Sequence, residues 1–349
     1  MLRQNDEAKC DLSYYIDLSD VTGAERANNK PMKFITNEGE FYSACINCHQ
    51  PRCLTYYENE YVCSGFDNFA ERQDSRVCAF NAIAWDNSKQ SIAIQLDACV
   101  GCGICASRCP FGAIYADNEK MAISLDRADD RFRVLRSDED ALALQDECVG
   151  KIRGLTVNVA RDTHVLDRAK SVYQCLDGSK ASHEAALLLC RNLMIEVGTQ
   201  CALRRTGVSG VRMDAVYASD KFSGAIEIEF QSDSLSVARN LLDDVAMMQA
   251  RSGLPIKSNT PLAICAAIPN TRQGYYQVCD DINRILGLHI RTLTIASLLI
   301  LVWNGVKLNL EGDRFHLGFR EASIRKYIES LLGYELCGDD SAGLLEPIK

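Results

Sequence analysis

The chain has 349 residues, 17 of them cysteine, and a formal net charge of −9. This length leaves room for two domains with separate hydrophobic cores. The N-terminus lacks the basic and apolar regions of a signal peptide, and the longest apolar stretch, residues 295–303, is too short to cross a bilayer. We therefore expect a cytoplasmic protein that does not enter a membrane, in which cysteines stay reduced or bind metal.

The acidic excess is confined to the first part of the chain. Residues 1–150 hold 25 acidic and 15 basic residues, whereas residues 151–349 hold 22 and 23. The overall negative charge argues at first against nucleic acid as a partner, but the second part is nearly neutral. Its basic residues could form a local positive surface, although ordinary solvated side chains explain them equally well: Arg204, Arg205, Arg212, Lys221, Arg239, Arg251 and Lys257.

A dense group of nine cysteines lies between residues 45 and 109. The run from Cys99 to Pro110 reads CxxCxxCxxxCP, the ligand spacing of a cubane [4Fe-4S] cluster. Gly101 and Gly103 permit the tight loop, because glycine adopts backbone angles that other residues avoid. Zinc sites more often split their ligands into two distant pairs. The spacing therefore predicts an iron-sulfur cluster.

The same region contains an internal duplication. The sequence VCAFNAI at residues 77–83 returns as RCPFGAI at residues 108–114, and DNSK at residues 86–89 returns as DNEK at residues 117–120. This pattern resembles the bacterial two-cluster ferredoxins, over about residues 34–125. The resemblance implies an α+β ferredoxin-like iron-sulfur domain with two [4Fe-4S] clusters, or at least one.

In these ferredoxins the fourth cysteine of each run binds the cluster of the other run. The resemblance therefore implies that Cys78 completes the cluster held by Cys99, Cys102 and Cys105. Cys109 would complete the other cluster.

The upstream ligands implied by the resemblance are Cys45, Cys48 and either Cys53 or Cys63. The first run reads CxxCxxxxC and is followed by a long insertion before Cys78, so the sequence leaves the choice between Cys53 and Cys63 open. A domain in which only the second site still binds a cluster also stays open.

Acidic residues between positions 126 and 140 indicate a boundary. We expect the ferredoxin-like domain, with an N-terminal extension, over residues 1–125, a linker or bridging helix over residues 126–170, and a second domain over residues 171–349.

The second domain begins with a long amphipathic pattern. Apolar residues recur at helical spacing over residues 181–205, and residues 211–217 and 225–230 read as two strands around a turn at residues 219–224. A second helix is expected over residues 234–249. The fully apolar residues 261–268 predict a strand buried on both faces, as in a sheet covered by helices.

Three acids are expected to meet on the two strands. Glu227 and Glu229 are two residues apart and so share a face, and Asp214 lies opposite Glu227 if the turn centres between Asp220 and Lys221. Crowded carboxylates repel one another unless a cation neutralises them, and oxygen ligands suit Mg²⁺ or Mn²⁺. An amphipathic edge strand whose glutamates face water explains the spacing equally well.

The order of these elements resembles the PD-(D/E)xK family of restriction-endonuclease-like nucleases, over about residues 180–270. The resemblance implies an α/β domain with a central mixed sheet flanked by helices. By position, Glu184 matches the acid of the first helix, Asp214 and Glu227 match the metal ligands, and Glu229 matches the residue of the third motif. That residue is usually Lys, and Met213 stands where the family often has Pro. A carboxylate at position 229 could bind a second metal ion or orient water, or it could mark a domain that binds DNA without cutting it.

The resemblance implies a metal-dependent DNA endonuclease in which Glu184, Asp214, Glu227 and Glu229 are catalytic, and the last three bind Mg²⁺ or Mn²⁺. A homodimer would suit cleavage of both strands. The alternative is an iron-sulfur electron-transfer protein whose C-terminal domain docks a redox partner or binds DNA without catalysis. The sequence lacks a dinucleotide-binding glycine motif and a phosphate-binding loop, so this alternative needs a partner as electron acceptor.

Overall fold

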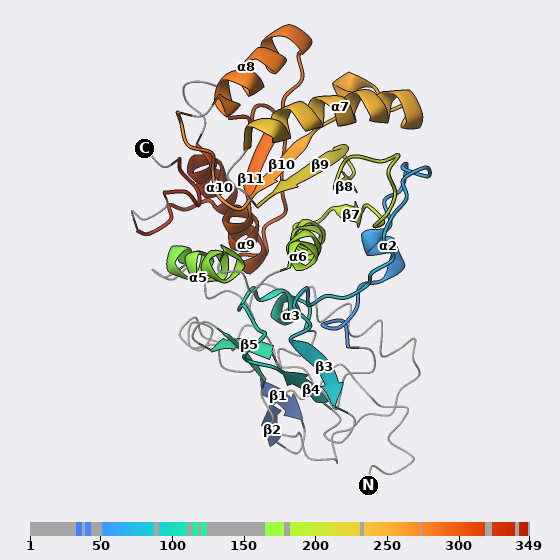
Figure 1. The fold of residues 1–349 in the computed structure, drawn as a ribbon. Coiled ribbons are helices and arrows are strands. Elements are labelled where there is room, and N and C mark those ends of the chain that lie inside the picture. Colours follow the sequence, from blue (N-terminus) through green and yellow to red (C-terminus); the bar gives the residue numbers. More distant parts are fainter. Residues whose placement is uncertain are drawn as a thin grey trace. The chain divides into compact units, whose positions relative to one another are not determined.

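The computed structural model describes residues 33–36, 39–42, 51–86, 91–109, 114–117, 120–123, 165–177, 182–230, 234–272, 274–317, 323–338 and 342–347. The chain divides into two compact units (Figure 1). The first comprises Met1–Thr55, Arg76–Asp162 and Trp303–Gly305, and the second comprises Tyr56–Ser75, Thr163–Val302 and Val306–Lys349.

The described residues of the first unit form three antiparallel hairpins. They are β1 (Lys33–Thr36) with β2 (Gly39–Tyr42), β3 (Ile83–Asp86) with β4 (Ser91–Ile94), and β5 (Ile114–Asp117) with β6 (Lys120–Ile123). The strands β3 and β5 begin at equivalent positions of the duplicated sequence, five residues after Cys78 and Cys109. The two repeats therefore form the same structure, which confirms the internal duplication.

The second unit contains a five-stranded mixed sheet in the order β11-β10-β9-β8-β7. Its strands are β7 (Gln200–Leu203), β8 (Ala215–Ala218), β9 (Ser223–Glu229), β10 (Leu262–Cys265) and β11 (Arg291–Thr294). The first three pair antiparallel, and β9, β10 and β11 pair parallel. β10 is buried along its whole length, as its apolar sequence predicts for a strand inside a sheet.

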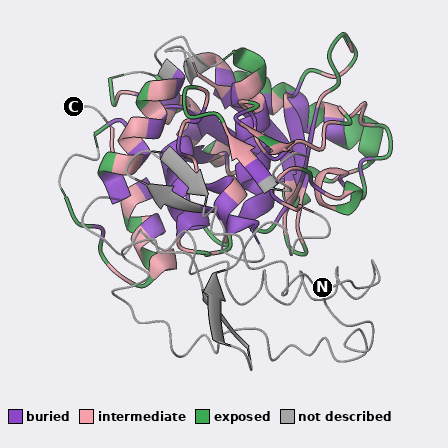
Figure 2. Ribbon diagram, turned by 90° about the horizontal axis from the view of Figure 1, so that it is seen from below, coloured by how far each residue is buried: buried purple, intermediate pink, exposed green. Residues whose placement is uncertain are grey.

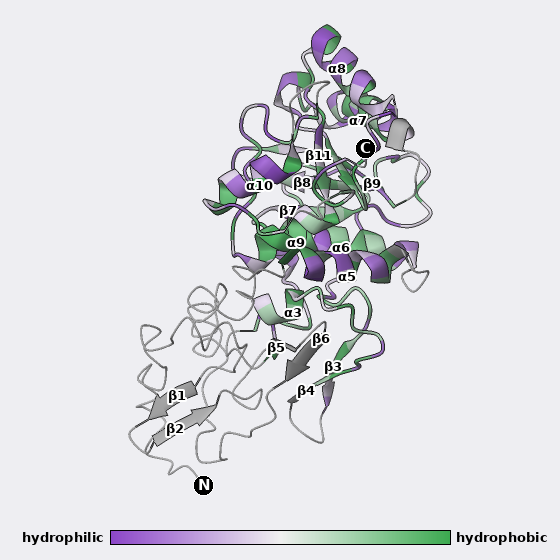
Figure 3. Ribbon diagram, turned by 90° about the vertical axis from the view of Figure 1, so that its left-hand side faces the viewer, coloured by the Kyte–Doolittle hydropathy of each residue, from purple (hydrophilic) through white to green (hydrophobic). Residues whose placement is uncertain are grey.

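Helices cover both faces of this sheet (Figures 1 and 3). The helices α7 (Ser234–Ser252) and α8 (Tyr275–Leu286) lie on one face, and α6 (His183–Glu196) and α9 (Ile295–Trp303) lie on the other. Further helices of the second unit, among the described residues, are α2 (Glu58–Tyr61), α5 (Val165–Asp177), the 3₁₀ helix η7 (Ile256–Ser258) and α10 (Ile324–Leu332). This arrangement confirms the expected mixed sheet flanked by helices.

The core of the second unit lies between the sheet and these helices. Figure 2 shows buried residues concentrated on the strands and on the inward helix faces. α9 is apolar on every side and all nine of its residues are buried, so it is a core helix. No helix in the described ranges is long and apolar enough to span a membrane.

The first long helix is shorter than its apolar pattern predicts. Instead of continuing to residue 205, α6 ends at Glu196, and Gly198 adopts a φ of 96°. This left-handed conformation suits glycine and turns the chain directly into β7. The prediction of helix over residues 197–205 is therefore wrong.

The segment Tyr56–Ser75 folds with the second unit rather than with the cysteine-rich unit around it in the sequence. Its Arg72 N–H donates to the Leu203 carbonyl oxygen at 2.7 Å, and the Arg205 N–H donates to the Ala70 carbonyl oxygen at 2.7 Å. These bonds extend the outer edge of β7. The units thus differ from the contiguous domains expected from the sequence, and α5 begins inside the expected linker at residues 126–170.

Candidate functional site

The cysteine loop from Cys99 to Cys109 turns sharply at its two glycines. Gly101 has a φ of 73° and Gly103 a φ of 79°, so both occupy the left-handed region that the spacing predicts for them. A short helix, α3 (Ile104–Ser107), follows directly. Trp303, in the same compact unit, donates its indole N–H to the Cys102 carbonyl oxygen at 2.8 Å and braces the loop.

The cysteine side chains of this loop gather around Cys105. Burial raises the pKa of the Cys105 thiol well above its usual value, and Cys102, Cys78, Cys99 and Cys109 raise it further. Cys78 thus lies near the loop although it comes from the other repeat. Such crowded thiols ionise together only when iron offsets their negative charge, so this arrangement fits an iron-sulfur cluster.

Cys78 also accepts a hydrogen bond at sulfur. The Ala82 N–H lies 3.2 Å from its Sγ. Hydrogen bonds of this kind stabilise negative charge on ligand sulfurs. The surroundings of Cys78 therefore support the prediction that it completes the cluster of Cys99, Cys102 and Cys105.

The upstream site is described only in part, because Cys45 and Cys48 lie outside the described residues. Cys53 is buried in the first unit. Cys63 is buried in the second unit, where its thiol donates to the Val216 carbonyl oxygen at 3.4 Å. Burial raises the pKa of Cys63 to about 12. These environments favour Cys53 as the third upstream ligand, and that assignment stays a prediction.

The pairing of β8 with β9 brings two of the predicted acids together. The register runs from Ala218 opposite Ser223 to Ala215 opposite Ile226, so Asp214 falls opposite Glu227. This confirms the predicted turn. β9 is the central strand of the sheet and Glu227 is only 9% exposed. An edge strand whose glutamates face water is therefore the wrong interpretation.

Asp214 is held by contacts on two sides. Its Oδ2 accepts the Ile228 N–H at 3.0 Å, and its Oδ1 lies 3.7 Å from the Arg204 guanidinium. Burial raises the pKa of Asp214, whereas the Ile228 N–H, Arg204 and His183 lower it. Burial raises the pKa of Glu227 still more, to about 9, with Asp214 and Asp244 adding to the effect. Each of these carboxylates therefore makes ionisation of its neighbours less favourable unless a cation is present.

The structure places the other two predicted acids differently. Glu229 ends β9 opposite Cys265 of β10 and is partly exposed, two residues along the strand from Glu227. Glu184 lies in the first turn of α6, where its side chain is 60% exposed and forms an ion pair with Arg72. Glu184 is thus paired with a residue of the segment Tyr56–Ser75. Its neighbour His183 lowers the pKa of Asp214 electrostatically.

Asp244 of α7 is a residue of this site that sequence reasoning missed. It is 1% exposed, and Asn240, one turn earlier, donates its side-chain N–H to Glu227 Oε2 at 3.5 Å. A signal was present in the sequence, because Asp244 falls among the helically spaced apolar residues Leu241, Val245 and Met248, all of which are buried. A lone acid on the apolar face of a helix needs a partner inside the protein.

The acids are near neighbours rather than a completed coordination shell. Among the residues that the structure describes, no three His, Cys, Asp or Glu side chains are arranged to hold a single metal ion. A cubane of four irons is wider than one ion, so its cysteines stand farther apart than the ligands of a single metal.

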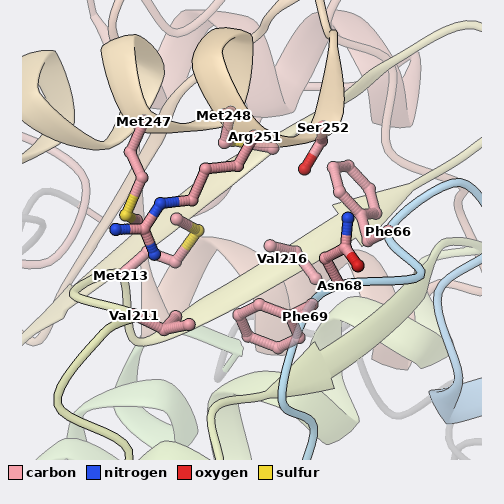
Figure 4. A pocket seen from close by; sticks show the side chains of 10 residues that line it. All are labelled: Phe66, Asn68, Phe69, Val211, Met213, Val216, Met247, Met248, Arg251 and Ser252. Atoms are coloured by element: carbon pink, nitrogen blue, oxygen red, sulfur yellow. The ribbon is translucent and has the colours of Figure 1, made fainter.

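A partly open apolar pocket is lined by residues that are close to these acids in the sequence (Figure 4). Met213 directly precedes Asp214, and Met247 follows Asp244 by three residues on α7. The segment Tyr56–Ser75 supplies part of the wall. The complete lining is Phe66, Asn68, Phe69, Val211, Met213, Val216, Met247, Met248, Arg251 and Ser252.

Comparison with known proteins supports the interpretation of the cysteine-rich unit as an iron-sulfur domain. Residues 92–115 match the family model for the 4Fe-4S binding domain. An uncharacterized ferredoxin of Methanocaldococcus jannaschii is 27% identical over 112 residues, which are 32% of this chain and 66% of that ferredoxin. This chain thus spans just under two thirds of that relative.

Among solved structures, the restriction endonuclease FokI aligns with 59% of this chain and 38% of its own, at 13% sequence identity and a TM-score of 0.31. A TM-score this low establishes no common fold. The glycine-turned cysteine loop, the duplicated hairpins and the matching family model together identify a ferredoxin-type domain that binds a [4Fe-4S] cluster.

Proposed function

We propose that this chain is a metal-dependent DNA endonuclease that carries ferredoxin-type [4Fe-4S] clusters. The pairing of Asp214 with Glu227 on neighbouring strands of a central sheet is the observation that carries the proposal. Support also comes from the element order, which runs helix, three antiparallel strands, helix and parallel strand, as in the nuclease family that the sequence resembles.

Asp214 and Glu227 would hold a divalent cation, Mg²⁺ or Mn²⁺. When bound, it would offset the charge of a phosphodiester and make a neighbouring water more acidic. Glu229, farther along β9, would orient that water or accept its proton. Arg204 would keep Asp214 ionised and in place through its contact at 3.7 Å.

Two of the basic residues that could form a positive surface, Arg212 and Lys221, already have acidic partners. Arg212 forms an ion pair with Asp243, and Lys221 forms one with Glu311 at 2.6 Å. All four side chains are exposed, so these pairs are weak and DNA could displace them. Duplex DNA as substrate, and a homodimer that cuts both strands, belong to this proposal.

The decisive experiment compares the purified, cluster-loaded chain with Asp214→Asn and Glu227→Gln in DNA cleavage with Mg²⁺ or Mn²⁺. Each substitution removes a ligand charge, so cleavage should be lost while the iron-sulfur absorbance stays unchanged. Asp220→Asn, in the exposed turn between β8 and β9, is the matched control and should cleave normally. A chain that cleaves no DNA across divalent metals would refute the nuclease proposal.

Glu229→Lys asks what the third acid does. If Glu229 stands only where the family usually has Lys, this variant should retain cleavage. If it binds a second metal ion, the same variant should be inactive, because a lysine repels a cation.

The matched 4Fe-4S domain and the ferredoxin relative favour a second candidate, an electron-transfer protein whose C-terminal domain binds a redox partner or DNA without catalysis. Reversible reduction of the clusters without any DNA cleavage by the intact chain would support it. If the clusters are structural, cleavage should instead follow folding and be indifferent to their redox state.

A further inference from the structure

The apolar pocket of Figure 4 has a buried interior and an accessible mouth. Phe66, Met213, Val216 and Met248 form the buried part, and Phe69 is half-buried, so its ring can be reached from the mouth. The interior of about 40 Å³ accepts the edge of a small ring, and the unbranched methionine side chains can move to admit more of it. The interior therefore suits a flat apolar group rather than a polar one.

The mouth of the pocket is polar and carries a positive charge. Among the described residues that line it, Arg251 is the single charged one, and its guanidinium donates to the neutral Gly210 carbonyl oxygen, so its charge is retained. Asn68, also exposed, adds an amide that can both donate and accept hydrogen bonds. The acids Asp67 and Glu71, which are close in sequence, do not line the pocket. A fitting ligand is therefore flat and apolar, hydrogen-bonds at its edge and has an anionic group beside it.

The pocket lies on the same face of the sheet as the two paired acids. Val216 lines the pocket and is two residues from Asp214, and residues two apart along an extended strand share a face. The helix α7 reaches both places: its Asn240 donates to Glu227 Oε2 at 3.5 Å, and its Met247, two helical turns later, lines the pocket. Two residues of strand span roughly 7 Å. The pocket therefore begins within the length of one nucleotide from the acids.

A nucleobase with its own phosphate has these properties. We propose that the pocket takes up one unpaired base of the DNA strand whose phosphate lies at Asp214 and Glu227. The inference rests on the proposed function, which places that phosphate. Phe69 stacks on the base, Asn68 bonds to its edge, and Arg251 holds a phosphate beside it. In a duplex substrate this base has to leave the helix.

The test measures DNA binding without divalent metal, so that cleavage plays no part. The full cluster-loaded chain is titrated into two fluorescently labelled single strands, an oligothymidine and an equally long sugar–phosphate strand without bases, and anisotropy gives each Kd. The unmodified chain should bind the oligothymidine about 10–100-fold more tightly, because stacking on an aromatic ring favours a base by this order. Phe69→Ala should abolish most of this preference, since the stacking ring is gone.

Phe222→Ala is the matched control. It is the same substitution at another half-buried phenylalanine of the second unit, in the turn between β8 and β9, and Phe222 does not line the pocket. Its preference for the oligothymidine should equal that of the unmodified chain. Phe69→Tyr, which keeps a ring, should retain the preference as well. Should Phe69→Ala fail to fold, Asn68→Ala provides the comparison at an exposed side chain and should reduce the preference.

The outcomes separate this inference from the nuclease proposal. Equal affinity of the unmodified chain for the two strands overturns the base pocket even if the chain cuts DNA, and this is the result expected if the pocket instead holds an apolar side chain of a protein partner. A preference that survives Phe69→Ala also overturns it. A preference that is lost in Phe69→Ala, in a chain that cuts no DNA with any divalent metal, supports the base pocket and removes the nuclease function.

Discussion

The thiol of Cys63 donates to the Val216 carbonyl oxygen inside the second unit. Iron binds the deprotonated sulfur, so binding iron would cost Cys63 this hydrogen bond. Cys53, five residues after Cys48 in the sequence, is buried in the first unit. At the scale of single residues, we therefore predict different chemical roles for two cysteines that are close in sequence.

This difference predicts the iron content of two variants. Cys63→Ala should keep the full amount of iron and acid-labile sulfide, although it loses a buried hydrogen bond. Cys53→Ala should lose about half of both if two clusters are present, because it removes a ligand of the upstream cluster. Iron and sulfide are measured on anaerobically purified protein, and Cys175→Ala serves as a control at another free cysteine. Equal losses in Cys53→Ala and Cys63→Ala would contradict the assignment.

The sequence was sufficient to predict the pairing of Asp214 with Glu227, because a short turn between two alternating strands fixes the register. It could not reveal the ion pair of Glu184, whose partner Arg72 lies 112 residues earlier. It could not assign Asp244 to the acids either, because only the packing of α7 on β9 brings that helix to them. Local pattern therefore predicted contacts across one turn and missed contacts that depend on tertiary packing.

Among the elements, the central strand β9 packs closely against the chain that enters β10. Its Gly224 lies against the chain that enters β10: a Cβ atom there would stand 2.5 Å from the Thr260 carbonyl oxygen. The same oxygen accepts the hydroxyl hydrogen of Tyr217 at 2.7 Å, and the Thr260 N–H donates to the Ser223 carbonyl oxygen at 2.9 Å. The Thr260 backbone and the Asn259 side chain therefore leave no room for a Cβ atom at this position.

We therefore expect Gly224→Ala to lower the free energy of unfolding by about 1–3 kcal/mol, as overpacking of a core does. Gly210→Ala is the control, because its Cβ would meet only the Arg251 guanidinium at 3.8 Å. Urea denaturation followed by circular dichroism measures both variants. Equal stability of the two would show that β9 and β10 separate more easily than this packing implies.

Element boundaries were harder to predict than element types. The helix, two strands, helix and buried strand expected over residues 181–268 come in the predicted order, but β7 was concealed in an apolar run that continues the pattern of α6. Gly198 alone marks the change of structure, and a single glycine inside a helical pattern is a weak signal. The apolar residues on both sides of it are buried in the same core, so hydrophobicity does not distinguish helix from strand there.

In the molecule as a whole, the second unit is discontinuous in sequence. The segment Tyr56–Ser75 contributes the bonds along the outer edge of β7 and the residues Phe66 and Phe69 of the apolar pocket. A division at one point of the chain was the natural prediction from composition. The long insertion between Cys53 and Cys78 was the sequence feature that did not fit a division at one point.

A fragment of residues 163–349 should consequently fold poorly. It lacks residues 56–75, so the outer edge of β7 and the apolar pocket are exposed. An open strand edge and an exposed apolar surface both favour aggregation. A fusion that joins residues 56–75 to this fragment through a flexible linker should restore a monodisperse, cooperatively unfolding protein. Size-exclusion chromatography and thermal unfolding compare the two, and a well-behaved fragment without residues 56–75 would contradict this account.

The residues on the two sides of this segment are hydrogen-bonded to each other. Thr55 and Arg76 form an antiparallel bridge, and the Val77 N–H donates to the Leu54 carbonyl oxygen at 2.9 Å, both within the cysteine-rich unit. The segment is therefore a closed loop, which has less chain entropy to lose when it packs on the second unit. Residues 182–230 follow this segment in the sequence, so the loop is synthesised before β7. We expect the edge bonds of β7 to form faster in chains whose clusters are bound than in chains without clusters, so cluster binding would affect the rate of folding as well as the cofactor content.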